Sequence, residues 1–201
     1  MQQVDPPEAP RSTEIVALTS EELERLIEAF VGTPYYVPVA LGARTGLRRD
    51  EVLALSLSDI DESAREIRVR RIVGDVPPGD APRFTEPKSP VAKDPIHLDD
   101  TALDLLREHM ASLEADVAKS GSSVTPGRLV FAHADGSPFV LAEFEKAFHD
   151  VASRAGFPGL RFHHLRDTLA AHLVQAGEPV SAVAERMRHQ DPGSTSRRYF
   201  T

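Results

Sequence analysis

Hydrophobic residues recur at helical intervals through most of the chain. Those of 23–30 fall on one helical face, directly after residues 19–22, Thr-Ser-Glu-Glu, which read as a capping box. A second helix is expected to begin after Pro34 and to end at Gly46, where glycine suits the positive φ of a helix end. Further helices are predicted over about 51–55, 101–119, 141–155, 163–176, 179–188 and 193–200.

Between the helices predicted over 51–55 and 101–119 the pattern changes to alternation, which predicts strands. Residues 58–73 favour a small hairpin around the polar residues 61–64, and 95–98 favours a return strand whose proline suits a sheet edge. The turn-rich segment 74–84, GDVPPGDAPRF, is expected to form no regular element. The pattern as a whole predicts an α+β fold, mainly helical with a small antiparallel sheet.

Composition is that of an ordinary globular protein. Of the 201 residues, 41% are hydrophobic and 27% are charged, and none is cysteine, which excludes disulfides and thiolate metal sites. The N-terminal sequence lacks the basic and apolar regions of a signal peptide, and no apolar run approaches the roughly 20 residues that span a bilayer. We therefore expect a soluble, cytoplasmic protein without a membrane partner.

The net charge of −8 argues against nucleic acid as a partner, but its distribution does not. Acidic residues are concentrated in 1–30 and 94–118, whereas 65–71, REIRVRR, holds four arginines and one acid. The stretch 161–201 holds six arginines, four acids and four histidines. Because exposed charges are screened beyond about 10 Å at 0.1 M salt, a basic face opposite an acidic one is compatible with DNA binding.

Several residues could together break DNA without a metal. Such chemistry needs a nucleophile, cations on the phosphate and a proton donor for the leaving oxygen; guanidinium groups suit the phosphate and tyrosine can be the nucleophile. No carboxylate cluster with metal-ligand spacing and no glycine-rich phosphate loop is present. The candidates are Arg48, Lys88, His163, Arg166, His189 and Tyr199.

These candidates lie in motifs that resemble those of the tyrosine recombinases, the phage integrase family. The sequence Thr-Gly-Leu-Arg-Arg-Asp-Glu at 45–51 is similar to the first family signature, and Pro-Lys-Ser at 87–89 to its lysine-bearing hairpin. His-His-Leu-Arg at 163–166 is similar to the H-x-L-R signature, Met-Arg-His at 187–189 stands where Leu-Gly-His is usual, and Tyr199 follows His189 by ten residues. The resemblance covers about residues 19–201.

The resemblance implies a site-specific recombinase that cleaves and rejoins DNA through a 3′-phosphotyrosyl link. Tyr199 would be the nucleophile, Arg48 and Arg166 would brace the phosphate with a further hydrogen bond from His189, and Lys88 would protonate the leaving 5′-oxygen. His163 would assist proton transfer or orient the phosphate. Glu51 would support Arg48, and further DNA contacts would come from Arg68, Arg70, Arg71 and Arg188. No ATP, metal or other cofactor is implied.

The resemblance also implies how the chain is organised. Residues 16–201 would be the catalytic domain and 1–15 a flexible tail or linker remnant, with the family's N-terminal core-binding domain absent. The partners would be double-stranded DNA, other protomers in a tetramer on DNA for the full-length enzyme, and accessory DNA-bending proteins. Two departures from the family pattern stand out: Asp167, at a variable position, and Arg188 in place of glycine, which could shift His189 or add a phosphate contact.

Other functions remain open at this point. A type IB topoisomerase-like enzyme would nick and close DNA with similar chemistry, and a noncatalytic DNA-binding relic would keep the fold alone. A metal-dependent nuclease is disfavoured by the lack of clustered carboxylates. Taken singly, each candidate also has a structural explanation, such as an ion pair, a helix cap, a solvated lysine or a packed tyrosine. The ordered set favours catalysis.

Overall fold

The fold is a helical body with two small antiparallel sheets, and the computed structural model describes residues 17–74, 76, 80, 82–87, 94–119 and 123–188. The helices in these residues are α1 (Ser20–Glu28), α2 (Tyr36–Thr45), α3 (Arg49–Val52), the 3-10 turn η1 (Leu57–Asp59), α4 (Asp100–Lys119), α5 (Leu141–Arg154), α6 (His163–Gln175) and α7 (Val180–Arg186). The strands are β1 (Ile60–Asp61), β2 (Glu66–Ile67), β3 (Ile72–Gly74), β4 (Arg83–Thr85) and β5 (Ile96–His97). In this part of the chain no helix combines the length and apolar character that a membrane crossing requires.

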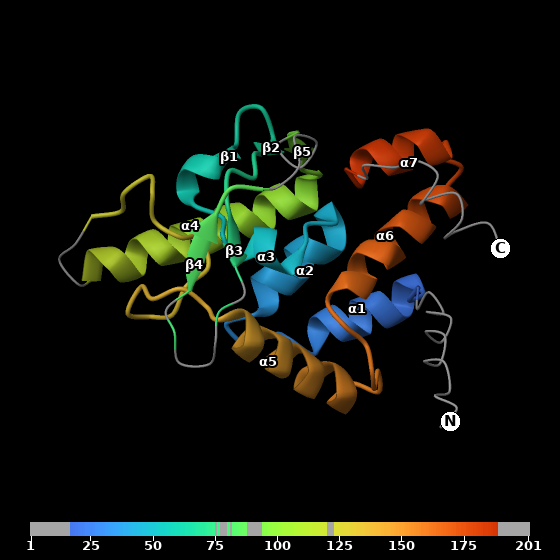
Figure 1. Cartoon of the computed structure of the whole chain (residues 1–201), viewed down its shortest axis with the longest axis horizontal. Helices are drawn as coiled ribbons and strands as arrows, with labels where there is room; N and C mark the ends of the chain where they lie inside the picture. Colours follow the sequence, from blue (N-terminus) through green and yellow to red (C-terminus); the bar gives the residue numbers. More distant parts are fainter. Residues whose placement is uncertain are drawn as a thin grey trace, which may run out of the picture.

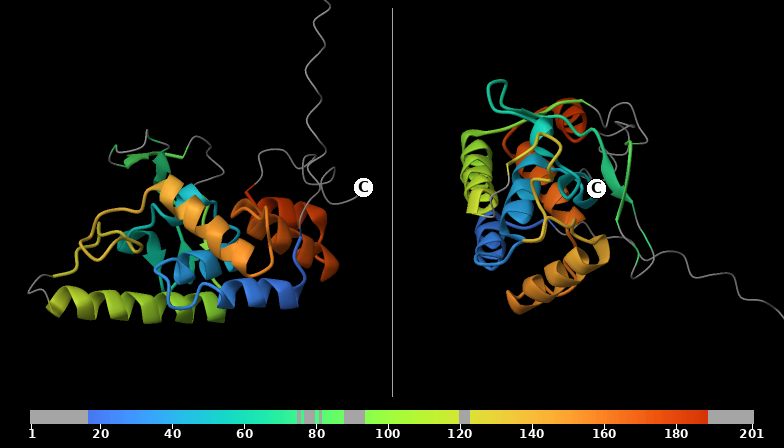
Figure 2. Two further views of the ribbon diagram at one scale, coloured as in Figure 1. Left: turned by 90° about the horizontal axis from the view of Figure 1, so that it is seen from below. Right: turned by 90° about the vertical axis from the view of Figure 1, so that its left-hand side faces the viewer.

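Helix α2 is the centre of the body and packs against α1, α4 and α6 (Figure 1). Its residues 38–43 are buried, as expected for a helix that is apolar on nearly all sides. Figure 2 shows α1 and α4 along one side of the molecule and the β3–β4 ribbon on the opposite side.

The predicted start of α1 and the predicted end of α2 are confirmed. The Thr19 hydroxyl accepts a hydrogen bond from the Glu22 amide at 3.2 Å, and the Glu22 carboxylate accepts one from the Thr19 amide at 2.9 Å, which completes the capping box of α1. Helix α2 ends at Gly46, whose φ is 68°. Helix α3 is shorter than predicted, since the chain leaves the helix after Val52.

The sheets match the predicted pattern in part. The hairpin β1–β2 and the return strand β5 form one sheet, with β5 at its edge as predicted. The expectation that 74–84 forms no regular element is wrong at both ends of that segment. Gly74 pairs with Arg83, and Phe84 pairs with Val73, in the second sheet, β3–β4. The β-branched residues of β3 supply a partner strand that the turn-rich composition did not reveal.

An aromatic cluster holds the start of α6. The ring of Phe162 meets Phe144 and Phe148 edge-on, with centroids 5.3 and 5.7 Å apart, and Phe148 stacks on Phe30 of the loop after α1 at 5.4 Å. All four rings are buried. Because Phe162 directly precedes α6, this packing fixes the position of the helix that begins at His163.

A second contact fixes the middle of α6 to the segment that enters the fold. The Leu18 amide donates to the Thr168 hydroxyl at 3.1 Å, and the Leu18 carbonyl lies 2.8 Å from Nε2 of His172. Both backbone groups of Leu18 are therefore satisfied by side chains of α6 rather than by a strand or a helix. The entering segment and α6 form one unit.

Candidate active site

A pocket of about 510 Å³ opens between the α2–α3 turn and the start of α6. Three of the candidate residues, Arg48, His163 and Arg166, line it together, although they come from distant parts of the sequence. The full lining is Leu47, Arg48, Arg49, Asp50, Glu145, Arg161, Phe162, His163, Arg166 and Asp167. The mixture of four arginines with three acids gives the pocket cationic groups that the acidic net charge of the chain conceals.

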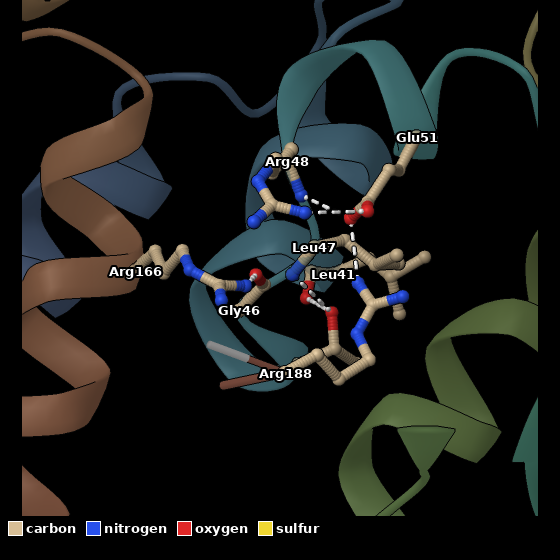
Figure 3. Close-up of polar contacts among 8 residues, drawn as sticks. Leu41, Gly46, Leu47, Arg48, Glu51, Arg166 and Arg188 are labelled. Atoms are coloured by element: carbon tan, nitrogen blue, oxygen red, sulfur yellow. Dashed lines mark hydrogen bonds and ion pairs between the residues drawn. The ribbon is translucent and has the colours of Figure 1, made fainter. Parts of the chain in front are cut away.

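Arg166 is held in the first turns of α6 by the end of α2. Its side chain is largely buried, and Nη1 donates to the Gly46 carbonyl at 2.5 Å (Figure 3). Gly46 can present this carbonyl because its positive φ turns the chain out of α2. A left-handed glycine therefore positions a guanidinium group at the pocket.

Arg48 is held by the buried carboxylate of Glu51. The Arg48 amide donates to Oε2 of Glu51 at 2.8 Å, and Nη1 of Arg48 donates to Oε1 at 3.0 Å. The first of these bonds is the cap of α3, and Glu51 is 1% exposed. The Arg48 side chain remains 44% exposed, so the carboxylate orients this guanidinium while leaving it accessible from the pocket. The predicted supporting contact of Glu51 with Arg48 is present in the structure.

Arg188 lies inside the protein, not on its surface. It is 3% exposed, its φ is 50°, and its Nη2 donates to Oε2 of Glu51 at 2.6 Å. Figure 3 shows Glu51 between Arg48 and Arg188. This position argues against the predicted phosphate contact of Arg188, because the guanidinium is buried against the Glu51 carboxylate. The unusual arginine after a helix was visible in the sequence, but its inward direction was not.

The two adjacent histidines have different environments. His163 is exposed and lines the pocket, whereas Nδ1 of His164 accepts a hydrogen bond from the Arg161 amide at 3.0 Å. The rings meet edge-on with centroids 4.1 Å apart. Burial, and then the neighbouring His163, lower the pKa of His164. The Nδ1 atom of His164 therefore caps the start of α6, and His163 is the histidine of this pair that lines the pocket.

Four further charged residues of the pocket carried no predicted role. Arg49 forms an ion pair with Glu145 of α5, and Arg161 is exposed just before α6. Burial, and then the negative charge of Glu51, raise the pKa of Asp50. Only the clustering of charges around the first signature could have pointed to Arg49 and Asp50. Among the described residues, no three histidine or acidic side chains gather as a metal site would require.

The basic stretch 65–71 is tied to its own surroundings. Arg68 pairs with Glu66 at 2.9 Å, and Arg70 donates to the Ser58 carbonyl at 2.9 Å. Both side chains are more than half exposed. Nε of Arg71 instead donates to the Ala54 carbonyl at 3.0 Å, and its guanidinium lies 5.2 Å from the centroid of Phe84, so it braces the β3–β4 ribbon. Arg68, Arg70 and the partly exposed Arg71 stay candidates for DNA contact.

The other predicted site residues, Lys88, His189 and Tyr199, lie outside the described residues, as do the tail 1–15 and the predicted helix 193–200. Their roles stay predictions from the sequence motifs.

Comparison with known proteins identifies similar sequences and folds. The model of the phage integrase family matches residues 17–201. A XerC-like tyrosine recombinase of Caldanaerobacter subterraneus subsp. tengcongensis is 29% identical over 204 residues, covering 96% of this chain and 52% of the relative. The integrase of Salmonella phage P22 is 30% identical over 181 residues, covering 88% of this chain and 41% of that protein. The chain thus spans about half the length of the curated relatives it matches.

Solved structures share the fold. The Tn1549 transposon integrase in complex with transposon right end DNA superposes with a TM-score of 0.79 at 19% identity, over 95% of this chain and 63% of that one. The XerA recombinase superposes with a TM-score of 0.67 at 22% identity, over 96% and 62%. The mainly helical α+β fold predicted from the sequence is confirmed.

Proposed function

The chain belongs to the phage integrase family, and from that premise we propose that it is the catalytic domain of a tyrosine-type site-specific DNA recombinase. The observation that carries the proposal is the meeting of Arg48, His163 and Arg166 around one pocket. Two guanidinium groups held by fixed backbone and carboxylate partners suit the non-bridging oxygens of a phosphate, whose charge grows in the transition state.

The proposed reaction breaks one ester bond and forms another. The Tyr199 hydroxyl attacks the scissile phosphorus, the bond from phosphorus to the 5′-oxygen breaks, and a 3′-phosphotyrosyl link forms. Lys88 gives a proton to the leaving 5′-oxygen, and His163 takes the phenol proton. Arg48, Arg166 and His189 bind the non-bridging oxygens. A free 5′-hydroxyl from another strand then reverses these steps, so the bond energy is kept and neither ATP nor a metal takes part.

The partners follow from the same proposal. Tn1549 integrase was solved with transposon DNA and XerH with its difH substrate, and we propose double-stranded DNA as the substrate here. We further propose that the full-length enzyme assembles as a tetramer on DNA, helped by DNA-bending proteins, and works in the cytoplasm. The names of the relatives, recombinases and integrases, favour strand exchange over a topoisomerase-like nicking and closing activity.

The test is a search for a covalent protein–DNA adduct. The chain is incubated with a library of nicked duplexes, which trap the cleaved strand, in buffer containing EDTA, and products are separated on denaturing gels. We expect an adduct with the wild-type chain that disappears in Tyr199→Phe. Tyr36→Phe makes the same chemical change at the start of α2, away from the pocket, and should keep the adduct.

If the chain forms no adduct, the same assay is repeated with a longer fusion protein. The part of the Caldanaerobacter relative that this chain does not match is fused before residue 17, because this chain covers 52% of that protein. If neither the chain nor the fusion forms an adduct that depends on Tyr199, the recombinase proposal is wrong and a noncatalytic role gains support.

A further inference from the structure

Arg188 lies two residues beyond Arg186, the last residue of α7, in a backbone conformation that usually selects glycine. Its φ of 50° lies in the left-handed region, and its amide donates to the Glu185 carbonyl at 2.7 Å. For a residue with a Cβ, this backbone region is higher in conformational energy than the right-handed region. An arginine is therefore kept at position 188 against its backbone preference, and its side-chain contacts must compensate.

The compensation comes from a buried ion pair with Glu51. Both side chains are almost completely buried, at 3% and 2% exposure, and Nη2 lies 2.6 Å from Oε2. A charge removed from water to this extent is tolerated only when it is paired and hydrogen-bonded. The carboxylate and the guanidinium therefore depend on each other, although they come from α3 and from the end of α7.

The same carboxylate positions Arg48. Oε2 of Glu51 accepts from the Arg48 amide as well as from Arg188, and Oε1 accepts from the Arg48 guanidinium. The three residues form a row in which the buried arginine holds the carboxylate and the carboxylate holds the accessible arginine (Figure 3). A change at Arg188 is transmitted to Arg48 through one side chain.

We propose that Arg188 is a positioning residue, which fixes the Glu51 carboxylate and thereby orients Arg48 for the phosphate. Arg188 does not touch DNA in this proposal. Its effect on cleavage rests on the proposed function, whereas its effect on the geometry of Arg48 does not.

The variants separate charge, shape and position. Arg188→Met removes the charge and keeps an unbranched apolar stem, and Arg188→Lys keeps the charge with a different donor geometry. Arg186→Met is the matched control, since it makes the same change two residues earlier in the last turn of α7, where the side chain is exposed. Thermal melts identify any variant that fails to fold; if Arg188→Met fails, Arg188→Lys decides.

Two measurements test the inference. The first is the side-chain NMR spectrum of protein labelled with ¹⁵N-arginine, in which Arg48 signals should shift and exchange faster with water in Arg188→Met, less so in Arg188→Lys, and not in Arg186→Met. The second is single-turnover cleavage of the trapped DNA at saturating protein. A displaced Arg48 should lower that rate by about 10- to 100-fold in Arg188→Met, with little change in the Kd for the same duplex and partial recovery in Arg188→Lys.

Each outcome decides between the alternatives. Unchanged Arg48 signals in folded Arg188 variants overturn the inference, and so does a wild-type cleavage rate. A loss of activity explained wholly by weaker DNA binding also overturns it, because Arg188 would then be a phosphate contact. If the wild-type protein and its fusion form no adduct, the proposed function fails, and the positioning inference is judged by the arginine spectra alone.

Discussion

Adding one methyl group at Gly42 should destabilise the protein, although alanine is the better helix former. A Cβ at this position in α2 would lie 2.3 Å from Cζ of Phe162 and 3.1 Å from both Cε atoms. Ordinary carbon–carbon contacts are about 3.5–4.0 Å, so the ring would have to move by more than about 1 Å. The ring cannot simply turn aside, because Phe144 and Phe148 pack against it and it is buried.

The magnitude follows from two opposing effects. Replacing glycine by alanine inside a helix gains about 0.5–1 kcal/mol, and overpacking a well-filled core costs about 1–3 kcal/mol. The severity of the overlap places the cost at the upper part of that range. We therefore expect Gly42→Ala to lower the free energy of unfolding by about 1–2 kcal/mol, which lowers Tm by roughly 2–8 °C for a chain of this size.

The assay is urea unfolding followed by circular dichroism, with two comparison proteins. Gly127→Ala is the matched control, because a Cβ there meets nothing within 4 Å and the residue has no positive φ. Adding Phe162→Leu to Gly42→Ala shortens the clashing side chain and should recover part of the loss. If Gly42→Ala is as stable as the wild type, or more stable, the helix-propensity gain has prevailed and the packing argument is refuted.

Three other changes test separate contacts. Glu51→Gln keeps the shape but removes the carboxylate that pairs with the buried Arg188 guanidinium, so urea unfolding should show a loss of about 3–5 kcal/mol; a loss below 1 kcal/mol would contradict the buried ion pair. Thr168→Val removes the buried acceptor of the Leu18 amide and should cost about 1–3 kcal/mol in the same assay, with an unchanged midpoint counting against that bond. Because the folded-state pKa of His164 is lowered, folding disfavours its protonated form: stability present above the unfolded pKa of about 6.5 is lost as pH falls through the folded pKa. His164→Asn, whose amide oxygen can replace the Nδ1 acceptor, should reduce the drop in urea midpoint between pH 7.5 and 5; an equal drop in both proteins would exclude His164 as its source.

Local rules predicted the parts of the fold that depend on neighbouring residues. The capping box of α1 and the glycine that ends α2 are each determined within a few residues, and both were predicted at the correct positions. The β3–β4 ribbon was missed because its pairing depends on two short strands separated by a long turn-rich segment, in which composition suggests only loop. Sequence patterns predict the backbone preferences of a segment better than they predict which other segment it pairs with.

The candidate site also combines features that the sequence predicts with features that depend on distant residues. The motifs placed Arg48 and Arg166 among the candidates, and the structure brings both to one pocket. The direction of the Arg188 side chain could not be predicted, since it depends on a left-handed backbone and on a carboxylate 137 positions away in the sequence. From its sequence, Arg71 was predicted only as a DNA contact. The structure adds a contact within the protein, because its Nε donates to the Ala54 carbonyl.

The hydrogen bond to the Gly46 carbonyl has a consequence for how this domain tolerates changes in loop length. The Arg166 guanidinium is bonded to the Gly46 carbonyl, and Arg48 is two residues further along the same turn. One short stretch of backbone therefore fixes the positions of both guanidinium groups. The distance between the two guanidinium groups therefore does not depend on the lengths of the loops that join the other elements. Insertions in those loops should leave the spacing of the two arginines unchanged.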